Sequence, residues 1–156
     1  MSHAALIDEY LAGPAALRAA VAGMSREQQM ARPIAGKWST LEVVCHLADF
    51  EPIYAERIKR VIVQPEAKFY SGDPNLFAKL GYENRDLEEE LAVVEFTRRQ
   101  LGRILRALGE ADFQKQGVHS EAGPMSIENL LRSVTTHITH HLPFIAEKRQ
   151  ALGATA

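Results

Sequence analysis

Residues 86–108 read DLEEELAVVEFTRRQLGRILRAL, and the spacing of the apolar side chains predicts a long helix packed in a bundle. The apolar residues with heptad-like spacing are Leu87, Leu91, Val94, Leu101, Leu105 and Leu108. Such a stripe is the seam along which one helix of a bundle packs against its neighbours. The stretch therefore favours a helix bundle, provided that partner helices exist elsewhere in the chain.

A clear partner helix precedes this stretch, at residues 40–63. Ser39 is a good N-cap, and Glu42 stands three residues later, as in a capping box. Pro52 lies inside the segment and removes one backbone donor, so a kink or break is expected there. The segment is nonetheless predicted as one helical unit.

A second partner is predicted nearer the N-terminus, at residues 4–22. Gly13-Pro14 is expected to interrupt it, with Pro14 at the first position of a new helical turn. A short helix is expected at residues 25–30, where Ser25 and Gln28 resemble a capping box.

The last helix is predicted at residues 126–152. Ser126 is a plausible N-cap, and Pro143 predicts a lost backbone hydrogen bond and a bend. One apolar stripe runs along this helix, formed by Ile127, Leu130, Leu131, Val134, Ile138, Leu142 and Ile145.

The four helices predict an all-α fold, a four-helix bundle that takes up residues 1–156 as a single domain. A further short helix is expected in a connector, at residues 74–80. No segment shows the alternation of apolar and polar residues that indicates a strand. Residues 64–75 and 109–123 are expected to be loops, and their length permits a crossover, so the order of the helices stays open.

Composition excludes several classes of protein. Of the 156 residues 46% are hydrophobic, which argues against disorder, and the net charge is −2. No basic run suggests a nucleic-acid partner, and no apolar stretch approaches the ~18 residues of a membrane span. The N-terminus does not resemble a signal peptide. Cys45 is the only cysteine, which fits a reducing cytoplasm and leaves His and carboxylates as the available metal ligands.

His137 and His141 are the first candidate metal ligands. Residues four apart on a helix have Cβ atoms about 5–6 Å apart, so two imidazoles can reach one ion from one helix face. Both lie on the margin of the apolar stripe, whereas His140 points about a quarter turn further out and is expected in solvent. The alternative is a pair of histidines at the edge of the core with ordinary hydrogen bonds.

His46 is the natural third ligand. It lies at the edge of the apolar arc of the helix at 40–63, flanked by Phe50 and Ile53. Three imidazoles from two helices would leave open coordination positions, as catalytic zinc sites do. The alternative is a histidine at the core margin beside Asp49 or Glu42.

Residues 36–49, GKWSTLEVVCHLAD, resemble the opening motif of the DinB-like superfamily, which includes proteins classed as YfiT-like metal-dependent hydrolases. That motif has Trp-Ser/Thr, several residues, and then His-Leu-x-Asp. The closing motif is His-x-x-x-His on the last helix, matched by His137 and His141. The resemblance covers about residues 5–150.

The resemblance implies a four-helix bundle in which His46, His137 and His141 bind a divalent metal, commonly zinc or nickel, in a pocket at one end. It also implies possible homodimers. Some relatives are transferases that act with a low-molecular-weight thiol such as bacillithiol or mycothiol. Many relatives have no established reaction.

Three functions are consistent with these residues. The first is a metal-dependent enzyme that acts on a small molecule. A divalent ion on three neutral imidazoles can lower the pKa of water, as a hydrolase requires, or of a thiol, as an S-transferase requires. The second is a metal-binding or stress-related module without catalysis. The third is an interaction protein with structural histidines.

Two further residues are candidates beside the metal. Asp49, one turn from His46, could orient an imidazole as a hydrogen-bond partner. Arg98 occupies a seam position and would be an interior cation for an anionic substrate or, more simply, part of a salt bridge within the bundle. Cys45 is predicted to be a packing residue, and Trp38 a hydrophobic staple or a plug at the bundle end.

Overall fold

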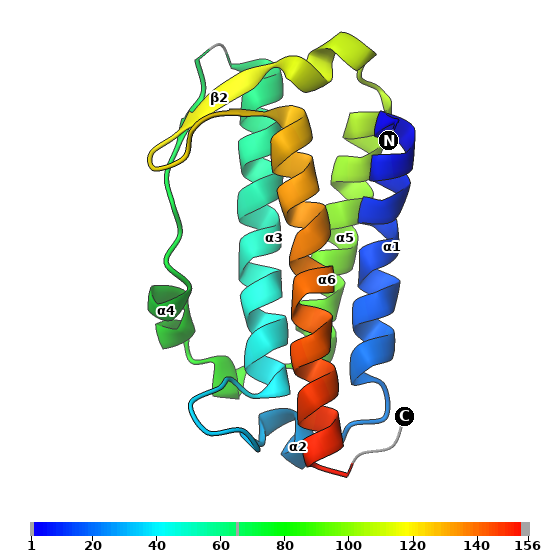
Figure 1. Cartoon of the computed structure of the whole chain (residues 1–156), viewed down its shortest axis with the longest axis vertical. Helices are drawn as coiled ribbons and strands as arrows, with labels where there is room; N and C mark the ends of the chain where they lie inside the picture. The colour runs from blue at the N-terminus through cyan, green and yellow to red at the C-terminus, as the bar shows by residue number, and fades with distance from the viewer. Residues whose placement is uncertain (1, 65, 154–156) are drawn as a thin grey trace.

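The computed structural model describes residues 2–64 and 66–153, and four long helices form its bundle (Figure 1). These helices are α1 (His3–Val21), α3 (Thr40–Val63), α5 (Leu87–Arg106) and α6 (Ile127–Ala151). Helices α1 and α3 each pack against both α5 and α6. Helices α1 and α3 therefore occupy diagonally opposite corners of the bundle, and α5 and α6 occupy the other two corners. The predicted four-helix bundle is confirmed.

Helices α3 and α5 run in the same direction, opposite to α1 and α6 (Figure 1). A long crossover therefore returns along the outside of the bundle from the end of α3 to the start of α5. It carries α4 (Pro74–Phe77) and two 3₁₀ turns, η1 (Ala78–Leu80) and η2 (Tyr82–Asn84). The predicted short helix at 74–80 is confirmed as α4 and η1, and simple up-down-up-down order is excluded.

Local capping fixes where the helices begin. Ser39 Oγ accepts the N–H of Glu42 at 3.1 Å, and the Glu42 carboxylate accepts the N–H of Ser39 at 2.7 Å, which completes the predicted capping box of α3. The same reciprocal pair, Ser25 and Gln28, starts the short helix α2 (Arg26–Met30). Ser126 caps α6 by accepting the N–H of Asn129. All three predicted helix starts are confirmed.

The prediction of no strands is wrong. Strand β1 (Lys68–Phe69) pairs in parallel with β2 (Gln116–His119), which pairs antiparallel with β3 (Gly123–Ser126). A further 3₁₀ turn, η3 (Glu110–Gln114), precedes β2. The strands are two to four residues long, too short for an alternating pattern to be read, and the pairing of β1 with β2 joins distant segments.

The expected interruption of α1 at Gly13-Pro14 is also absent, because the helix continues through both residues. Pro14 has no N–H to donate to the carbonyl of Tyr10, and Arg98 Nη1 donates to that carbonyl instead, at 2.7 Å. A Cβ on Gly13 would lie 2.3 Å from the same nitrogen. The Gly-Pro pair thus makes room and a hydrogen-bond acceptor for an arginine.

Arg98 and Glu51 form a buried ion pair, at 2.9 Å, with both side chains fully enclosed. The hydroxyl of Tyr10 donates to the other oxygen of Glu51 at 2.8 Å, and Arg98 Nη2 also donates to the carbonyl of Val134 at 2.7 Å. The salt bridge expected as the simpler interpretation of Arg98 is confirmed. The alternative, a cation for substrate, stays a prediction, and the guanidinium has no exposed surface in this structure.

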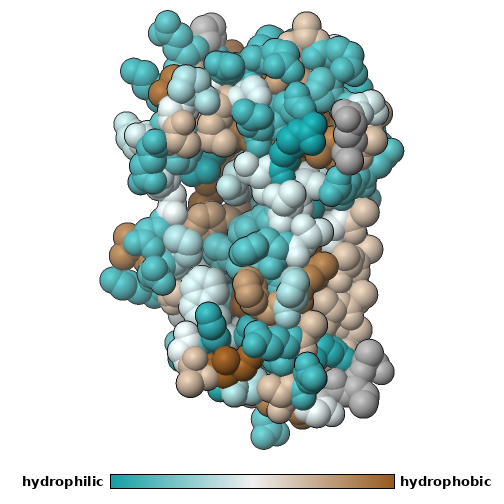
Figure 2. Space-filling model, viewed as in Figure 1, coloured by the Kyte–Doolittle hydropathy of each residue, from teal (hydrophilic) through white to brown (hydrophobic). Residues whose placement is uncertain are grey.

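Two apolar clusters make up the core on either side of this pair. One, toward the sheet, includes Leu6, Ile7, Ile58, Phe69, Phe113, Ile127 and Leu130; the other, toward α2, includes Leu17, Leu41, Leu47, Tyr82, Leu91, Val94, Ile138 and Ile145. The outer surface over α6 is mainly hydrophilic, with apolar side chains scattered across it (Figure 2). No described helix combines the length and the apolar character needed to cross a bilayer.

Candidate metal centre

His46, His137 and His141 meet between α3 and α6. Each offers one ring nitrogen, and these three atoms lie within 4.8 Å of one another. The Nε2 atoms of His46 and His137 are 2.9 Å apart. Nitrogens bound to one zinc ion at about 2.0–2.1 Å lie about 3.3 Å from each other in a tetrahedral site. That separation falls between the shortest distance, 2.9 Å, and the 4.8 Å limit for the group. His140 is exposed and stands outside the group, as predicted.

The three imidazoles are also free of other partners on their far side. The Nδ1 atoms of all three are buried and form no hydrogen bond among the described residues. Buried polar atoms are normally paired, so these three Nδ1 atoms are exceptions. The converging nitrogens on the other side of the rings are the ones that could bind a cation, and three imidazoles suit a divalent transition metal.

Aromatic side chains enclose the site and keep the imidazoles neutral. Trp38 and Phe50 lie against His46, with ring centroids 5.2 and 4.7 Å away. Burial lowers the pKa of His46 to about 4, although the charge of Asp49 opposes this. Burial, and next the neighbouring imidazoles, lower the pKa of His137 to about 3 and that of His141 to about 4. Neutral rings have the free lone pairs that metal binding requires.

A pocket of about 300 Å³ opens beside His141. Its lining comes from the segment before α3, from α4 and from the last turns of α6: Gly36, Lys37, Trp38, Val43, Asn75, His141, Phe144, Glu147 and Lys148. The volume suits a small molecule. A ligand in this pocket would reach one face of the three-histidine group.

The profile of the DinB superfamily matches residues 9–145. The chain belongs to the DinB superfamily. Three curated proteins of similar sequence carry the name "Putative metal-dependent hydrolase". The one from Oceanobacillus iheyensis is 27% identical, and the aligned region covers 85% of this chain and 77% of the relative. The one from Geobacillus thermodenitrificans is 30% identical, and the aligned region covers 90% of this chain and 80% of the relative.

A solved structure shows the same fold. YfiT from Bacillus subtilis, described as "a probable metal-dependent hydrolase with an unusual four-helix bundle topology", superposes with a TM-score of 0.91 at 24% identity. The match covers 99% of the DinB protein studied here and 91% of YfiT. The resemblance drawn from the two histidine motifs is thereby confirmed.

Asp49 does not orient an imidazole of this DinB protein. Its carboxylate accepts the hydroxyl of Tyr82 at 2.9 Å and Arg85 Nη1 at 2.8 Å, and Arg85 also pairs with Glu90. Among the described residues, Asp49 therefore forms no hydrogen bond to His46. Asp49 faces outward on α3, toward η2, so its contacts attach the crossover to the bundle.

Cys45 takes the role predicted for it. The thiol of Cys45 is buried against the carbonyl of Tyr82, and burial raises its pKa to about 12, so it stays a neutral packing group. Trp38 lies between His46 and Tyr82 and packs, partly buried, against the core cluster toward α2, and its role as a staple or plug stays a prediction.

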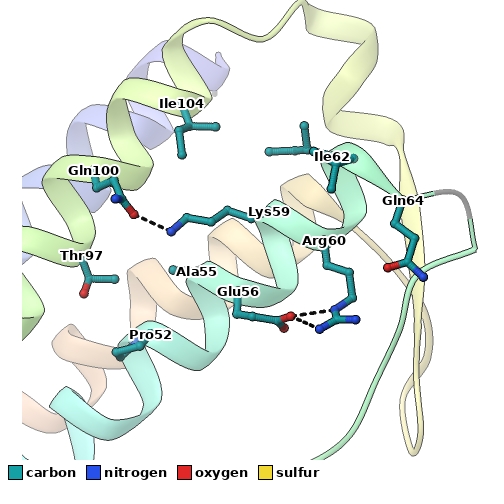
Figure 3. A pocket seen from close by; sticks show the side chains of 11 residues that line it. Pro52, Ala55, Glu56, Lys59, Arg60, Ile62, Gln64, Thr97, Gln100 and Ile104 are labelled. Carbon is teal, nitrogen blue, oxygen red and sulfur yellow. Dashed lines mark hydrogen bonds and ion pairs between the residues drawn. The ribbon is translucent and has the colours of Figure 1, made fainter.

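A larger pocket, of about 630 Å³, lies between α3 and α5 (Figure 3). Its charged side chains are already engaged: Lys59 bonds to Gln100 at 2.5 Å, and Arg60 pairs with Glu56. The lining contains no histidine and no cysteine. The smaller pocket beside His141 is therefore the better candidate for chemistry.

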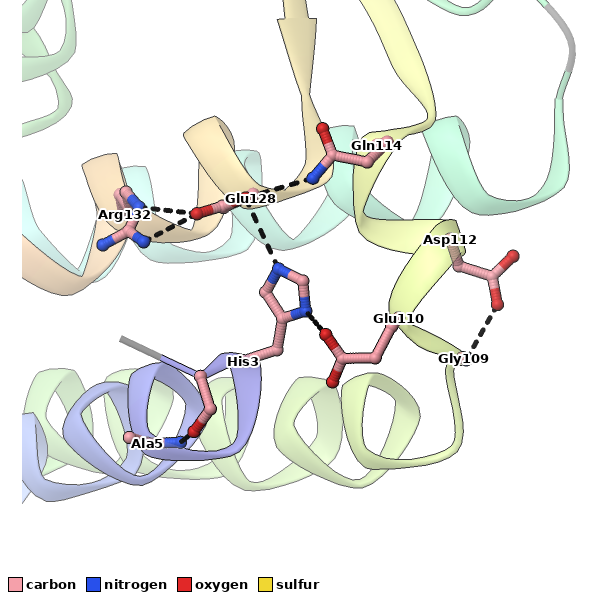
Figure 4. Close-up of polar contacts among 9 residues, drawn as sticks. His3, Ala5, Gly109, Glu110, Asp112, Gln114, Glu128 and Arg132 are labelled. Carbon is pink, nitrogen blue, oxygen red and sulfur yellow. Dashed lines mark hydrogen bonds and ion pairs between the residues drawn. The ribbon is translucent and has the colours of Figure 1, made fainter.

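The two remaining histidines are structural. His3 lies 2.5 Å from Glu110 and 3.4 Å from Glu128 (Figure 4). Its ring also stacks on Phe113. It joins the start of α1 to η3 and α6. His119 Nδ1 accepts backbone N–H groups from the turn between β2 and β3. Neither belongs to the three-histidine group.

Two polar residues of the pocket, Lys148 and Asn75, were not predicted from the sequence. Lys148 had a usable signal, because it stands eleven residues after His137 and so returns to nearly the same face of α6. Asn75 had none, since only the long crossover brings it to this end of the bundle.

Proposed function

We propose that this DinB protein is a metal-dependent hydrolase of a small molecule, and that His46, His137 and His141 hold a divalent transition metal, zinc or nickel. The observation that carries the proposal is the convergence of three neutral imidazoles from two helices. The names of the curated relatives support it.

The chain's residues divide the work in this proposal. When bound, a divalent ion on three neutral ligands supplies Lewis acidity and lowers the pKa of water or of a thiol. The histidines hold it from two rigid helices, which limits the movement of the ligands. Trp38 and Phe50 cover the His46 side and exclude solvent there, so the open side faces the pocket beside His141.

A thiol S-transferase is the second candidate, and the lack of a carboxylate favours it. The three-histidine group among the described residues contains no carboxylate, and Asp49 is bound to Tyr82 and Arg85. Hydrolysis gains from a general base near the reacting water, whereas a thiol acidified by a metal needs less help. A low-molecular-weight thiol would then be the co-substrate. A binding module without catalysis is the remaining alternative.

Metal analysis tests the site. Protein prepared without a His tag should contain about one equivalent of metal, and both His46→Ala and His137→Ala should lose it because two ligands hold a divalent ion poorly. His140→Ala, an exposed neighbour on the same helix, should retain it. Stoichiometric metal in His46→Ala and His137→Ala would rule out this ligand set.

Activity assays separate the candidates. Metal-loaded protein should hydrolyse a member of a panel of esters and amides, and the His137→Ala variant should not. Turnover only with thiol acceptors would identify the S-transferase. Absence of turnover in both panels would favour the binding module.

A further inference from the structure

Lys148 is a buried ammonium with few partners. Its side chain is 3% exposed, and its Nζ donates one hydrogen bond, to the carbonyl of Phe144 at 3.0 Å. It forms no ion pair with a carboxylate of the described residues. An ammonium has three donors, and lysine is rarely buried unless it is paired. The two remaining donors therefore need an anion or water.

The position of this ammonium ties it to the candidate metal centre. Eleven residues at about 100° each bring Lys148 back to within about 20° of His137 on α6. Side chains on a helix lean toward its N-terminus, and the bond to the Phe144 carbonyl places Nζ about one turn from His141. Lys148 and His141 both line the pocket of about 300 Å³.

The rest of the pocket suits an anion with an apolar part. Lys37 adds a second positive charge to the lining, Glu147 its carboxylate and Asn75 an amide. The carboxylate of Glu42, which is engaged by Arg32 and the N–H of Ser39, also acts on Lys148. The positive end of the α3 dipole lies close by, since Trp38 and Val43 are also in the lining. Trp38 and Phe144 provide the apolar walls.

We propose that Lys148 anchors the carboxylate or phosphate group of a small amphipathic ligand in this pocket, with Lys37 at the entrance and the apolar part of the ligand against Trp38 and Phe144. The assignment of this ligand as the substrate rests on the proposed function, because it would place the reactive end of the molecule at the histidines. The anion site itself depends only on the lysines and the pocket.

A structural role for Lys148 makes a different prediction. A lysine in the last turns of a helix can bond to a free carbonyl and interact favourably with the helix dipole. On that account Lys148→Met would lower thermal stability and leave the binding of anions unchanged. If Lys148 is instead an unpaired buried charge, Lys148→Met should keep or raise thermal stability and weaken anion binding. Methionine fills the same space without the cost of desolvation.

The test uses metal-free full-length protein in the presence of a chelator. Calorimetric titration with phenylacetate, with its neutral analogue 2-phenylethanol and with inorganic phosphate separates the charge from the apolar contact. We expect saturable binding of phenylacetate or phosphate, and weaker binding of 2-phenylethanol. Lys148→Met should weaken anion binding about ten-fold or more, the loss of one charge-assisted contact. Lys148→Arg, which keeps the positive charge, should retain part of the affinity for the anion.

Lys115→Met is the matched control, since Lys115 is an exposed lysine beside η3, at the opposite end of the bundle. Its anion affinity should equal that of the unsubstituted protein. Failure of both anions to bind the unsubstituted protein, or equal affinity in Lys148→Met, would overturn the proposal. Because the metal is absent from this assay, intact anion binding together with a failed metal analysis would refute the proposed function alone.

Discussion

One buried arginine connects the four long helices. Arg98 on α5 bonds to Tyr10 on α1, Glu51 on α3 and Val134 on α6. Its Nε has no partner among the described residues, so the network is not fully satisfied. A buried ion pair of this kind is weak evidence for stability, because desolvation offsets much of the attraction. Its clearer consequence is a fixed relative position of the helices that carry the histidines.

Removing one partner of this pair should be costly. Arg98→Met leaves the Glu51 carboxylate buried and unpaired, and we expect it to lower the free energy of unfolding in urea by about 3–5 kcal/mol. Arg98→Met combined with Glu51→Leu should recover much of that loss, because no charge remains in the core. Arg99→Met, in an exposed i,i+4 pair with Glu95, should change the value by less than about 0.5 kcal/mol. A double variant no more stable than Arg98→Met would contradict this account.

At the scale of the helix, start signals are local and therefore readable from sequence. Ser39 and Glu42 satisfy each other's N–H groups within one turn, so their spacing alone predicted the first residue of α3. The strands depend on partners far along the chain, as when Lys68 pairs with Val118, and no local pattern encodes that. The same limit explains the wrong expectation for Gly13-Pro14, and it explains why the sequence did not reveal the bond from Arg85 to Asp49: Arg98 and Arg85 come from other elements.

The cap of α3 can be tested by one substitution. Ser39→Ala removes the acceptor for the Glu42 N–H in a buried first turn, and we expect a loss of about 1 kcal/mol in the free energy of unfolding. Ser133→Ala is the matched control, because the Ser133 hydroxyl bonds to the carbonyl of Asn129 inside α6 and caps nothing. Chemical denaturation of the two variants gives the comparison. Equal effects would show that the cap contributes no more than an ordinary side-chain bond.

At the scale of the whole molecule, the topology creates the candidate centre. Because α3 and α5 are parallel, the crossover between them runs the length of the bundle and brings Asn75 to the pocket beside His141. The three histidines could be predicted from sequence because His46 on α3, and His137 and His141 on α6, lie at the inward margins of their apolar stripes. The pocket could not, since its lining combines a connector, the crossover and the last turns of α6.

Acid should destabilise the metal-free protein in a defined window. His46, His137 and His141 have pKa values of about 4, 3 and 4 when folded, against about 6.5 when unfolded. Between these values the unfolded chain binds more protons, so stability rises with pH. The contribution is fully present above pH ~6.5 and is lost as the pH falls toward ~4. The pKa of Glu128 is lowered to about 2, first by its hydrogen bond from Arg132, so this carboxylate makes stability depend on pH below that window as well.

Thermal unfolding in chelator from pH 7 to pH 4 measures this effect. The midpoint temperature should fall steadily across the window in the unsubstituted protein and in His140→Ala, whose exposed imidazole is outside the group. His137→Phe should show a shallower fall, because one of the three histidines whose pKa the fold lowers is gone. Added zinc should raise the midpoint at pH 7, and the gain should shrink on acidification because protons compete for the ligands. A midpoint that stays constant from pH 6.5 to pH 4 in the metal-free protein would show that these imidazoles are not held neutral by the fold.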